Sequence, residues 1–343
     1  MACTSATESP SASNVTSVTD DEAHVENPCE EGQRLFDHEH LATDPVCIPE
    51  SPQRVVTLDL NSLEFMLIHD LPFVSTSAAA QLFVSNTYSE WLEAFIAKTE
   101  GLPDTGFPPN LEAIAEAQPD LIITEIGFHD EEAQDLMAEI APMIVYEEGD
   151  ALQDWQPQFH FIADALGMIE ENEALVSAYE ERIAALRTSI GDSLNGQTIS
   201  VVRALPDQEI GLRLSGSFTG VIINQLHLEQ PESQQPSVDE ATGFVQIDVS
   251  RERWDLADGD YLFVYGLQPD AAGTNEAQVL IESLSDDAIW NNLNAVQNGN
   301  AYAMDGHWQG FGILSAHKVI DDMFRILAET EPSIPNPLLE PGA

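Results

Sequence analysis

The chain has 343 residues, of which 43% are hydrophobic, so it is long enough for two domains with ordinary cores. Sixty Asp and Glu residues against 11 Lys and Arg give a formal net charge of -49, which excludes nucleic acid and anionic lipid surfaces as natural partners. No hydrophobic run approaches the roughly 18 residues of a membrane-spanning helix, and we therefore expect a globular protein.

The segment 1–52 is expected to form a tether ahead of the first lobe. Cys3 follows Ala2 and opens a stretch rich in Ser, Thr and acidic residues, which is typical of disorder. Such an Ala-Cys junction is typical of a processed bacterial lipoprotein, so Cys3 is predicted to carry a lipid, the alternative being a stray cysteine. Cys29 and Cys47 are predicted to form a disulfide. Their loop of about 18 residues makes the bond worth on the order of 3 kcal/mol.

Strands and helices alternate at short spacing in the segment 53–171. Strands are expected at "RVVTLDL", "PFVST", 120–125 and "PMIVYEE", and helices over "NSLEFMLIHD", 109–118 and 131–140. Asn61 or Ser62 is the expected cap of the first helix. This alternation indicates a parallel sheet covered on both faces. Loops at the carboxyl ends of its strands, such as "TEIGFHD", are where such sheets hold ligands.

The alternation stops after Leu152, and Gly167 is the main turn signal before Ile190. Hydrophobic residues recur there at a spacing of three to four, at Leu175, Tyr179, Ile183, Leu186 and Ile190. This stripe predicts one long amphipathic helix over 172–191.

A second α/β half is expected over 192–331. Its strands are predicted at "TISVVRAL", "EIGLRLSG", "FVQID", "DYLFVYG" and "NAYAM", and its helices at "SFTGVIINQLHL", "NEAQVLIESLS" and 313–329. The proline-rich segment 332–343 is expected to be a loose tail. The predicted fold is α/β, with two Rossmann-like lobes whose parallel-type sheets are joined by one long α-helix.

The chain resembles the iron-siderophore solute-binding proteins of bacterial ABC importers over about 53–330. Five segments occur in the order and spacing of that family: "PQRVVTLD", "PPNLEAIAEAQPDLIIT", "ISVVRALPDQEIGLRLSGSFTGVIINQLHLEQP", "VSRERWDLADGDYLFV" and "IWNNLNAVQNGNAYAMDGHWQGFGILSAHKVIDDMFRIL". The resemblance implies a ligand cleft between two lobes, little hinge motion because the linking helix is stiff, and delivery of a ferric chelate to a permease.

The resemblance also implies two docking residues. Glu112 in "PPNLEAIAEAQ" and Glu252 in "VSRERW" match the acids with which the two lobes of such proteins contact permease arginines. Carboxylates fixed on opposite lobes can form charge-assisted hydrogen bonds with guanidinium groups and set the register of a complex. The alternatives are a carboxylate favoured by the helix dipole for Glu112 and a pairing of Glu252 with Arg251 or Arg253.

Ligand contacts are implied less directly. Gly106 stands where hydroxamate-binding members often have an arginine, whereas Arg203, at the end of "TISVVRAL", resembles an arginine of other members. A guanidinium group there could bind the chelating oxygens of an Fe(III) complex, and aromatic walls suit a large, partly apolar ligand. The alternatives are a strand-end arginine paired with an acid and aromatic residues in the core. The implied ligand contacts are Arg203, Arg213, Phe107, Phe128, Phe218, Phe244 and Trp308.

No protein metal site and no cofactor are expected. His38 and His40 are interpreted as solvated residues of the tether, because a histidine metal site needs ligands that converge from several segments. The implied function is the extracytoplasmic capture of a ferric siderophore by a membrane-anchored monomer that delivers it to an ABC permease. Haem or cobalamin binding is the alternative on the same scaffold, with His307 as an axial haem ligand.

The large negative charge affects two expectations, the charge of the ligand and the salt concentration in which the protein works. It disfavours polyanionic chelates, so hydroxamate or mixed citrate-hydroxamate siderophores are expected in preference to triscatecholates. A charge of this size is tolerated where the Debye length falls to roughly 3 Å at about 1 M salt, which favours a salt-loving source over an ordinary one. No nucleotide-binding or nucleophile motif is visible. An enzyme is therefore not expected, and a metal-dependent hydrolase or a ligand-sequestering module without a transporter is a lesser alternative.

Overall fold

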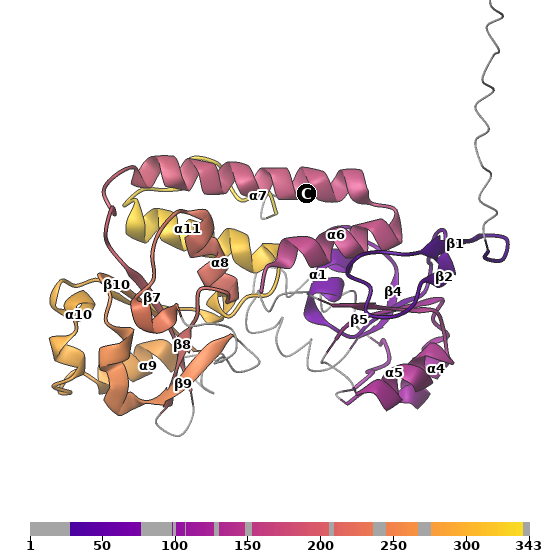
Figure 1. The fold of residues 1–343 in the computed structure, drawn as a ribbon, viewed down its shortest axis with the longest axis horizontal. Coiled ribbons are helices and arrows are strands. Elements are labelled where there is room, and N and C mark those ends of the chain that lie inside the picture. Colours follow the sequence, from indigo (N-terminus) through magenta and orange to yellow (C-terminus); the bar gives the residue numbers. More distant parts are fainter. Residues whose placement is uncertain are drawn as a thin grey trace, which may run out of the picture.

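The computed structural model describes residues 28–76, 98, 101–106, 108–126, 130–147, 153–205, 209–235, 245–266 and 276–338. Two lobes lie on the same side of one long helix, α7 (Ile169–Ile190), which runs along the top of Figure 1. The predicted two-lobed α/β fold with a linking helix is confirmed. The structure starts this helix three residues earlier than predicted.

The N-terminal lobe contains a four-stranded parallel sheet with the strand order β4-β3-β5-β6. Successive residues of each strand enter different cores: Val55 and Ile123 pack under α1 and α6, whereas Val56 and Ile122 pack against α4 and α5. This alternation covers the sheet on both faces, as predicted. The elements are β3 (Val55–Thr57), α1 (Leu60–Ile68), β4 (Phe73–Thr76), α4 (Leu111–Ala117), β5 (Leu121–Glu125), α5 (Glu131–Ala138), β6 (Met143–Tyr146) and α6 (Trp155–Leu166).

The C-terminal lobe contains a five-stranded sheet with the strand order β11-β10-β7-β8-β9. Strands β11, β10 and β7 are parallel, but β8 runs antiparallel to both of its neighbours, β7 and β9, so this sheet is mixed rather than wholly parallel. The short connection from β7 to β8 explains the direction of β8, because a parallel neighbour needs a crossover of a dozen or so residues. The strands are β7 (Ile199–Ala204), β8 (Glu209–Arg213), β9 (Gln246–Ser250), β10 (Tyr261–Tyr265) and β11 (Ala301–Met304).

Helices cover both faces of this second sheet. Helices α8 and α11 pack on the face that turns toward α7, and α9, α10 and η3 pack on the other. Their bounds are α8 (Phe218–Gln225), η1 (Glu232–Gln234), η3 (Arg251–Ala257), α9 (Glu276–Ser283), η4 (Trp290–Asn292), α10 (Asn294–Gln297), η5 (Gly306–Trp308) and α11 (Ile313–Leu327).

The linking helix is built as its hydrophobic stripe predicts. Tyr179, Ile183, Leu186 and Ile190 are buried in a core that also contains residues of both sheets. Gly167, with a φ of 70°, ends α6 in the left-handed conformation and lets the chain turn into α7. One core is continuous beneath α6, α7 and α11, so hydrophobic packing joins the two lobes along this helix layer.

Polar contacts also join the two lobes directly. The buried carboxylate of Glu64, in α1, accepts a hydrogen bond of 2.7 Å from the backbone N–H of Leu314, in the first turn of α11. Gly312 provides the space, because a Cβ atom there would lie 2.5 Å from Glu64 Oε1. A side chain of one lobe thus caps a helix of the other.

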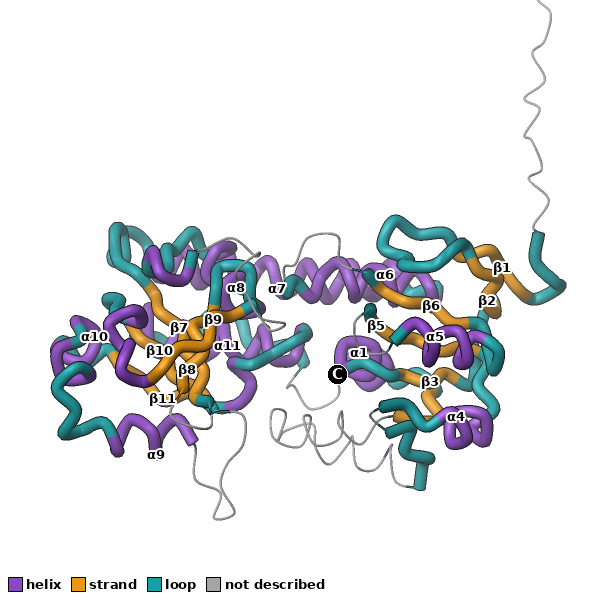
Figure 2. Tube along the Cα trace, turned by 60° about the horizontal axis from the view of Figure 1, so that its bottom comes forward, coloured by secondary structure: helices purple, strands orange, loops and turns teal. Residues whose placement is uncertain are grey.

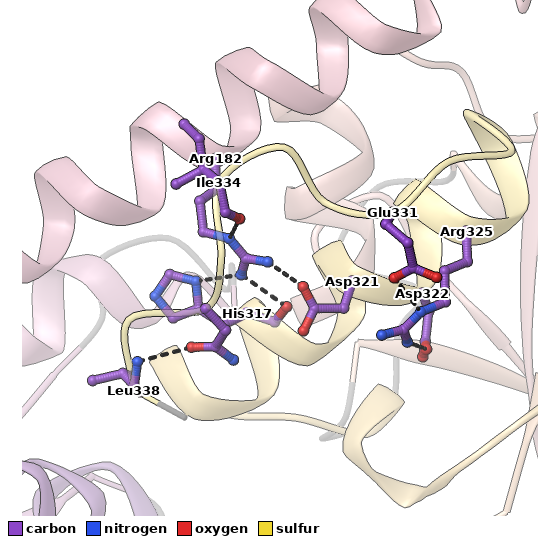
Figure 3. A network of polar contacts seen from close by, with 9 residues as sticks. Arg182, His317, Asp321, Asp322, Arg325, Glu331, Ile334 and Leu338 are labelled. Atoms are coloured by element: carbon purple, nitrogen blue, oxygen red, sulfur yellow. Dashed lines mark hydrogen bonds and ion pairs between the residues drawn. The ribbon is translucent and has the colours of Figure 1, made fainter. Parts of the chain in front are cut away.

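Arg182 ties α7 to α11 and to the C-terminal segment (Figure 3). Its fully buried guanidinium pairs with Asp321, donates to the carbonyl oxygen of Ile334 (3.1 Å) and contacts Nδ1 of His317 (2.8 Å). Burial, followed by the Arg182 charge, lowers the pKa of His317 to about 3, so its neutral Nδ1 accepts from the guanidinium. The expectation of a loose tail from residue 332 is wrong up to Leu338, which is 6% exposed.

The segment 28–52 belongs to the N-terminal lobe rather than to a tether. Strands β1 (Gln33–Phe36) and β2 (Val46–Pro49) form an antiparallel hairpin beside β6 (Figure 2). A disulfide joins Cys29 to Cys47, whose Cα atoms are 5.6 Å apart. The predicted lipid site, Cys3, lies outside the described residues. Within the described part of the chain, no helix is both long and apolar enough to cross a membrane.

Candidate functional site

The carboxyl ends of the N-terminal strands bring two acids together. Asp59, which follows β3, caps α1: it accepts hydrogen bonds of 2.8 Å from both the backbone N–H and the hydroxyl of Ser62. Gln158 of α6 donates to the same carboxylate at 3.2 Å and also bonds Glu125, the last residue of β5. The cap is therefore Asp59 rather than the predicted Asn61 or Ser62.

These two acids share one environment. Burial raises the pKa of Asp59 to about 6, and burial together with the charge of Asp59 raises the pKa of Glu125 to about 8. Because the groups interact, the two values belong to the pair. Near neutral pH the pair holds one proton and one negative charge, so it can both donate and accept a hydrogen bond.

The C-terminal lobe carries two arginines on neighbouring strands of its sheet, and one of them, Arg203, lies at the corresponding edge. Arg203, near the end of β7, pairs in register with Tyr265, the last residue of β10, and is half-buried. Arg213 is fully buried; burial lowers its pKa, with a further lowering by the neighbouring Arg203. Arg203 thus places a positive charge at the carboxyl end of β7, whereas Arg213 ends β8, which runs antiparallel to β7, and therefore lies away from that edge.

Arg213 has a structural partner across the lobes. It donates to the Oε1 atoms of Gln246 (3.2 Å) and Gln153 (2.7 Å). Gln153 precedes α6, and its backbone N–H donates to the carbonyl oxygen of Gly216 at 2.8 Å. These contacts assign Arg213 to the junction between lobes, and its contact with a ligand stays a prediction.

The aromatic residues of the prediction are not brought together on one described surface. Phe218, at the start of α8, is 1% exposed, and Trp308 is fully buried. The Trp308 ring lies 4.6 Å from that of Phe263, and its indole N–H donates to Asp322 at 2.9 Å. Both side chains form core here, and a ligand contact would require the loop around them to move. Phe107, Phe128 and Phe244 lie outside the described residues.

The two predicted docking acids occupy equivalent positions. Each is the second residue of a short helix: Glu112 follows the cap Asn110, and Glu252 follows the cap Ser250. Both side chains are exposed, and neither forms an ion pair with a described residue. Arg253 pairs with Asp255 instead, and Arg251 donates to the Leu205 carbonyl, so the proposed pairing of Glu252 with either arginine is not formed.

The histidines divide into two groups. His307 is 5% exposed, and its Nε2 lies 2.7 Å from Asp322, which leaves little of the ring for a haem iron. The interpretation of His38 and His40 as solvated residues of a tether is wrong. The hairpin places the His38 ring 5.2 Å from Phe161 of α6 and the His40 ring 5.5 Å from Tyr146 of β6. Among the described residues, no three His, Cys, Asp or Glu side chains are arranged to hold a metal.

Sequence reasoning did not identify the Asp59–Glu125 pair, Glu64 or Gln153. Glu125 had a visible signal, since it ends a buried strand just before the loop "TEIGFHD". Asp59 stands just after a buried strand in the same way. Glu64 gave no such signal, because an acid within a helical pattern is ordinarily exposed.

The comparisons with known proteins agree with this architecture. The family model described as "Periplasmic binding protein" matches residues 84–307. The probable siderophore-binding lipoprotein YfiY of Bacillus subtilis is 28% identical over 289 residues, covering 83% of this chain and 85% of its own. The Fe(3+)-citrate-binding protein YfmC of the same organism is 26% identical over 80% of this chain and 81% of its own.

Solved structures share the fold. Staphylococcus aureus SirA complexed with staphyloferrin B has a TM-score of 0.66 at 23% identity, over 85% of this chain and 98% of SirA. The petrobactin-binding protein YclQ of Bacillus subtilis has a TM-score of 0.65 at 21% identity, over 87% and 99%. Because the family model matches more than half of this chain, the chain belongs to the periplasmic binding protein family.

Proposed function

We propose that this protein captures a ferric siderophore outside the cytoplasm and delivers it to an ABC permease, without catalysing a reaction. The observation that carries the proposal is the family membership together with relatives named as siderophore- and Fe(3+)-citrate-binding proteins. The preferred ligand is a hydroxamate or mixed citrate-hydroxamate chelate. The formal charge of -49 supports this preference, because it repels polyanionic chelates.

Arg203 is the proposed contact for the chelating oxygens. It is half-buried at the carboxyl edge of β7, where open α/β sheets bind ligands. A guanidinium group offers paired donors to the oxygens of a ferric complex. The protonated member of the Asp59–Glu125 pair is the proposed donor from the opposite lobe.

Titration of the purified protein with ferric complexes tests this proposal. The panel contains a trihydroxamate, a citrate-hydroxamate, a triscatecholate and haem, with binding measured by calorimetry at high salt. We expect the first two to bind most tightly. Arg203→Gln should weaken them by at least about tenfold, the size of one charge-assisted hydrogen bond.

Arg253→Gln is the matched control, since it removes the same charge from an exposed side chain. Equal affinities in both variants would remove Arg203 from the site. Tightest binding of the triscatecholate or of haem would refute the ligand preference, and failure of the whole panel would refute the function.

Glu112 and Glu252 are the proposed permease contacts. Their exposure, their equivalent helix positions on opposite lobes and the absence of a described ion partner support this role. Because the packed helix layer fixes the lobes, the two carboxylates would be held at one separation, which gives a two-point register. The lipid at Cys3 is proposed to keep the protein at the membrane.

Charge reversal tests the docking. Glu112→Lys with Glu252→Lys should abolish uptake of a radioiron-labelled siderophore by cells while leaving its affinity for the purified protein unchanged. Glu116→Lys with Glu232→Lys makes the same change of net charge at exposed positions and should transport normally. Retained uptake in the first variant would refute the assignment.

A further inference from the structure

A cavity of about 490 Å³ lies in the N-terminal lobe and along α7, and neither Asp59 nor Arg203 is among the residues that line it. Its walls come from three segments: the loop after β1, the start of α6 and the first turns of α7. The disulfide-closed hairpin brings the first of these segments onto the two helices. The lining residues are His38, Glu39, His40, Asp154, Gln156, Pro157, His160, Asn172, Glu173, Val176 and Ser177.

Most of the charged groups that line this cavity are carboxylates, which accept hydrogen bonds. Glu39, Asp154 and Glu173 contribute carboxylates, and no Lys or Arg is among the described residues that line it. Burial raises the pKa of Asp154, as expected for a carboxylate that lacks a compensating cation. Burial also lowers the pKa of His38, so this imidazole stays neutral and does not repel a cation.

Asn172 provides the second, independent observation. This residue of α7 is 1% exposed, yet its side-chain carbonyl oxygen has no hydrogen-bond partner among the described residues. Buried polar atoms are satisfied in the great majority of cases, so one that lines a cavity indicates a donor within it. Gln156 Nε2 is a buried donor in the same wall, also without a described partner.

The imidazoles are not arranged for a metal ion. The ring centroid of His38 lies 5.7 Å from that of His40 and 6.4 Å from that of His160. Nδ1 of His38 already accepts from the His40 backbone N–H at 3.1 Å, and Nδ1 of His40 lies 3.2 Å from the Glu147 carbonyl oxygen, to which it can only donate. The cavity is also far larger than a single ion requires.

We propose that this cavity binds a small organic amine cation, whose ammonium group donates hydrogen bonds to Asn172 Oδ1 and to the carboxylates of Asp154 and Glu173. An oxygen of the ligand, where it has one, accepts from Gln156 Nε2, and its carbon chain packs on Val176 and Pro157. This site is separate from the proposed siderophore contacts, and its occupancy does not depend on the proposed function.

Calorimetric titration with 1,4-diaminobutane tests the proposal, with 1,4-butanediol as the uncharged control of the same shape. At high salt, where diffuse attraction to the acidic surface is screened, we expect saturable binding of one diamine and none of the diol. Asn172→Leu and the exposed Glu173→Gln should each weaken the diamine about tenfold, which corresponds to one charge-assisted hydrogen bond. The matched control, Glu181→Gln, changes an exposed acid of the same helix and should bind normally.

Glu173→Gln keeps the test valid if Asn172→Leu does not fold, because its side chain is exposed and its substitution removes no core contact. No saturable diamine binding, or equal weakening by Glu173→Gln and Glu181→Gln, would overturn the proposal. Displacement of the diamine by Zn²⁺ at equimolar concentration would also overturn it, in favour of a metal site.

Discussion

The two lobes have the same layered architecture but differ in their sheets and in the charged residues near the ends of their strands. The N-terminal sheet is wholly parallel and ends in the Asp59–Glu125 pair, whereas the C-terminal sheet is mixed and carries Arg203 and Arg213. One shared layered fold therefore places an acid pair at the strand ends of one lobe and an arginine at those of the other, so a few strand-end residues set the local chemistry.

The lobes are also held to the helix layer by different means. The C-terminal lobe is joined to α7 through the buried Arg182–Asp321 ion pair. The N-terminal lobe uses the hydrophobic packing of α6, the hydrogen bond of Glu64 to α11 and the disulfide-closed hairpin. Each attachment can be removed on its own.

Replacing Arg182 should give the largest loss of stability. Arg182→Met removes one partner of a buried pair and leaves Asp321 uncompensated, so we expect the free energy of unfolding to fall by about 3–5 kcal/mol in urea titrations. Adding Asp321→Leu should recover part of the loss, because an apolar pair of similar volume avoids the buried charge. Arg187→Gln, at the exposed contact with His227, is the control. A single variant as stable as the wild type would show that the ion pair does not hold the C-terminal lobe.

Removing the disulfide should affect the N-terminal lobe. With Cys29 and Cys47 both changed to Ala, the closed loop is lost and the unfolding free energy should fall by about 3 kcal/mol. A protease should then cut first in the hairpin. The affinity for the diamine should also fall, because His38, Glu39 and His40 of the hairpin line the cavity proposed to bind it. Intact C-terminal protection in hydrogen exchange would confirm that the effect is confined to one lobe. If the hairpin stays protected without the disulfide, packing of Phe36 alone is sufficient.

The acid pair should make stability depend on pH. Because the pKa values of Asp59 and Glu125 are raised in the folded state, to about 6 and about 8, the native protein binds more protons than the unfolded chain. Their stabilising contribution is complete below the ordinary carboxyl pKa and is lost as the pH rises through these two values. Allowing for solvent screening of the partly exposed Glu125, we expect a fall on the order of 1–2 kcal/mol between about pH 5 and about pH 8.5.

Glu125→Gln should flatten this dependence, because an amide does not ionise and leaves Asp59 without a charged neighbour. Glu132→Gln, an exposed acid of the same lobe, should leave it unchanged. Unfolding midpoints in urea across the pH range measure both. The same slope in both variants would assign the pH dependence to the overall charge of the chain rather than to the pair.

Much of this architecture was predictable because it depends on the spacing of hydrophobic residues and on turn and cap residues that are close along the chain. The stripe from Tyr179 to Ile190 predicted the linking helix, and the alternating runs predicted both α/β lobes. Glu112 could be placed near a helix start, since a helix over 109–118 was predicted, whereas the short helix that begins at Arg251 and carries Glu252 was not predicted. Such signals depend on periodicity and capping, which involve neighbours along the chain.

What the sequence alone determined, then, is the order of elements, the two halves and the helix between them. Only the tertiary structure decided that β8 and β9 run antiparallel, that Trp308 is buried against Phe263, and that Asp59 meets Glu125. It also decided that Arg213 bonds Gln153 and that His38 lines a cavity. These outcomes depend on side chains far apart in sequence, whose burial and charge become fixed only when the sheets and helices pack together.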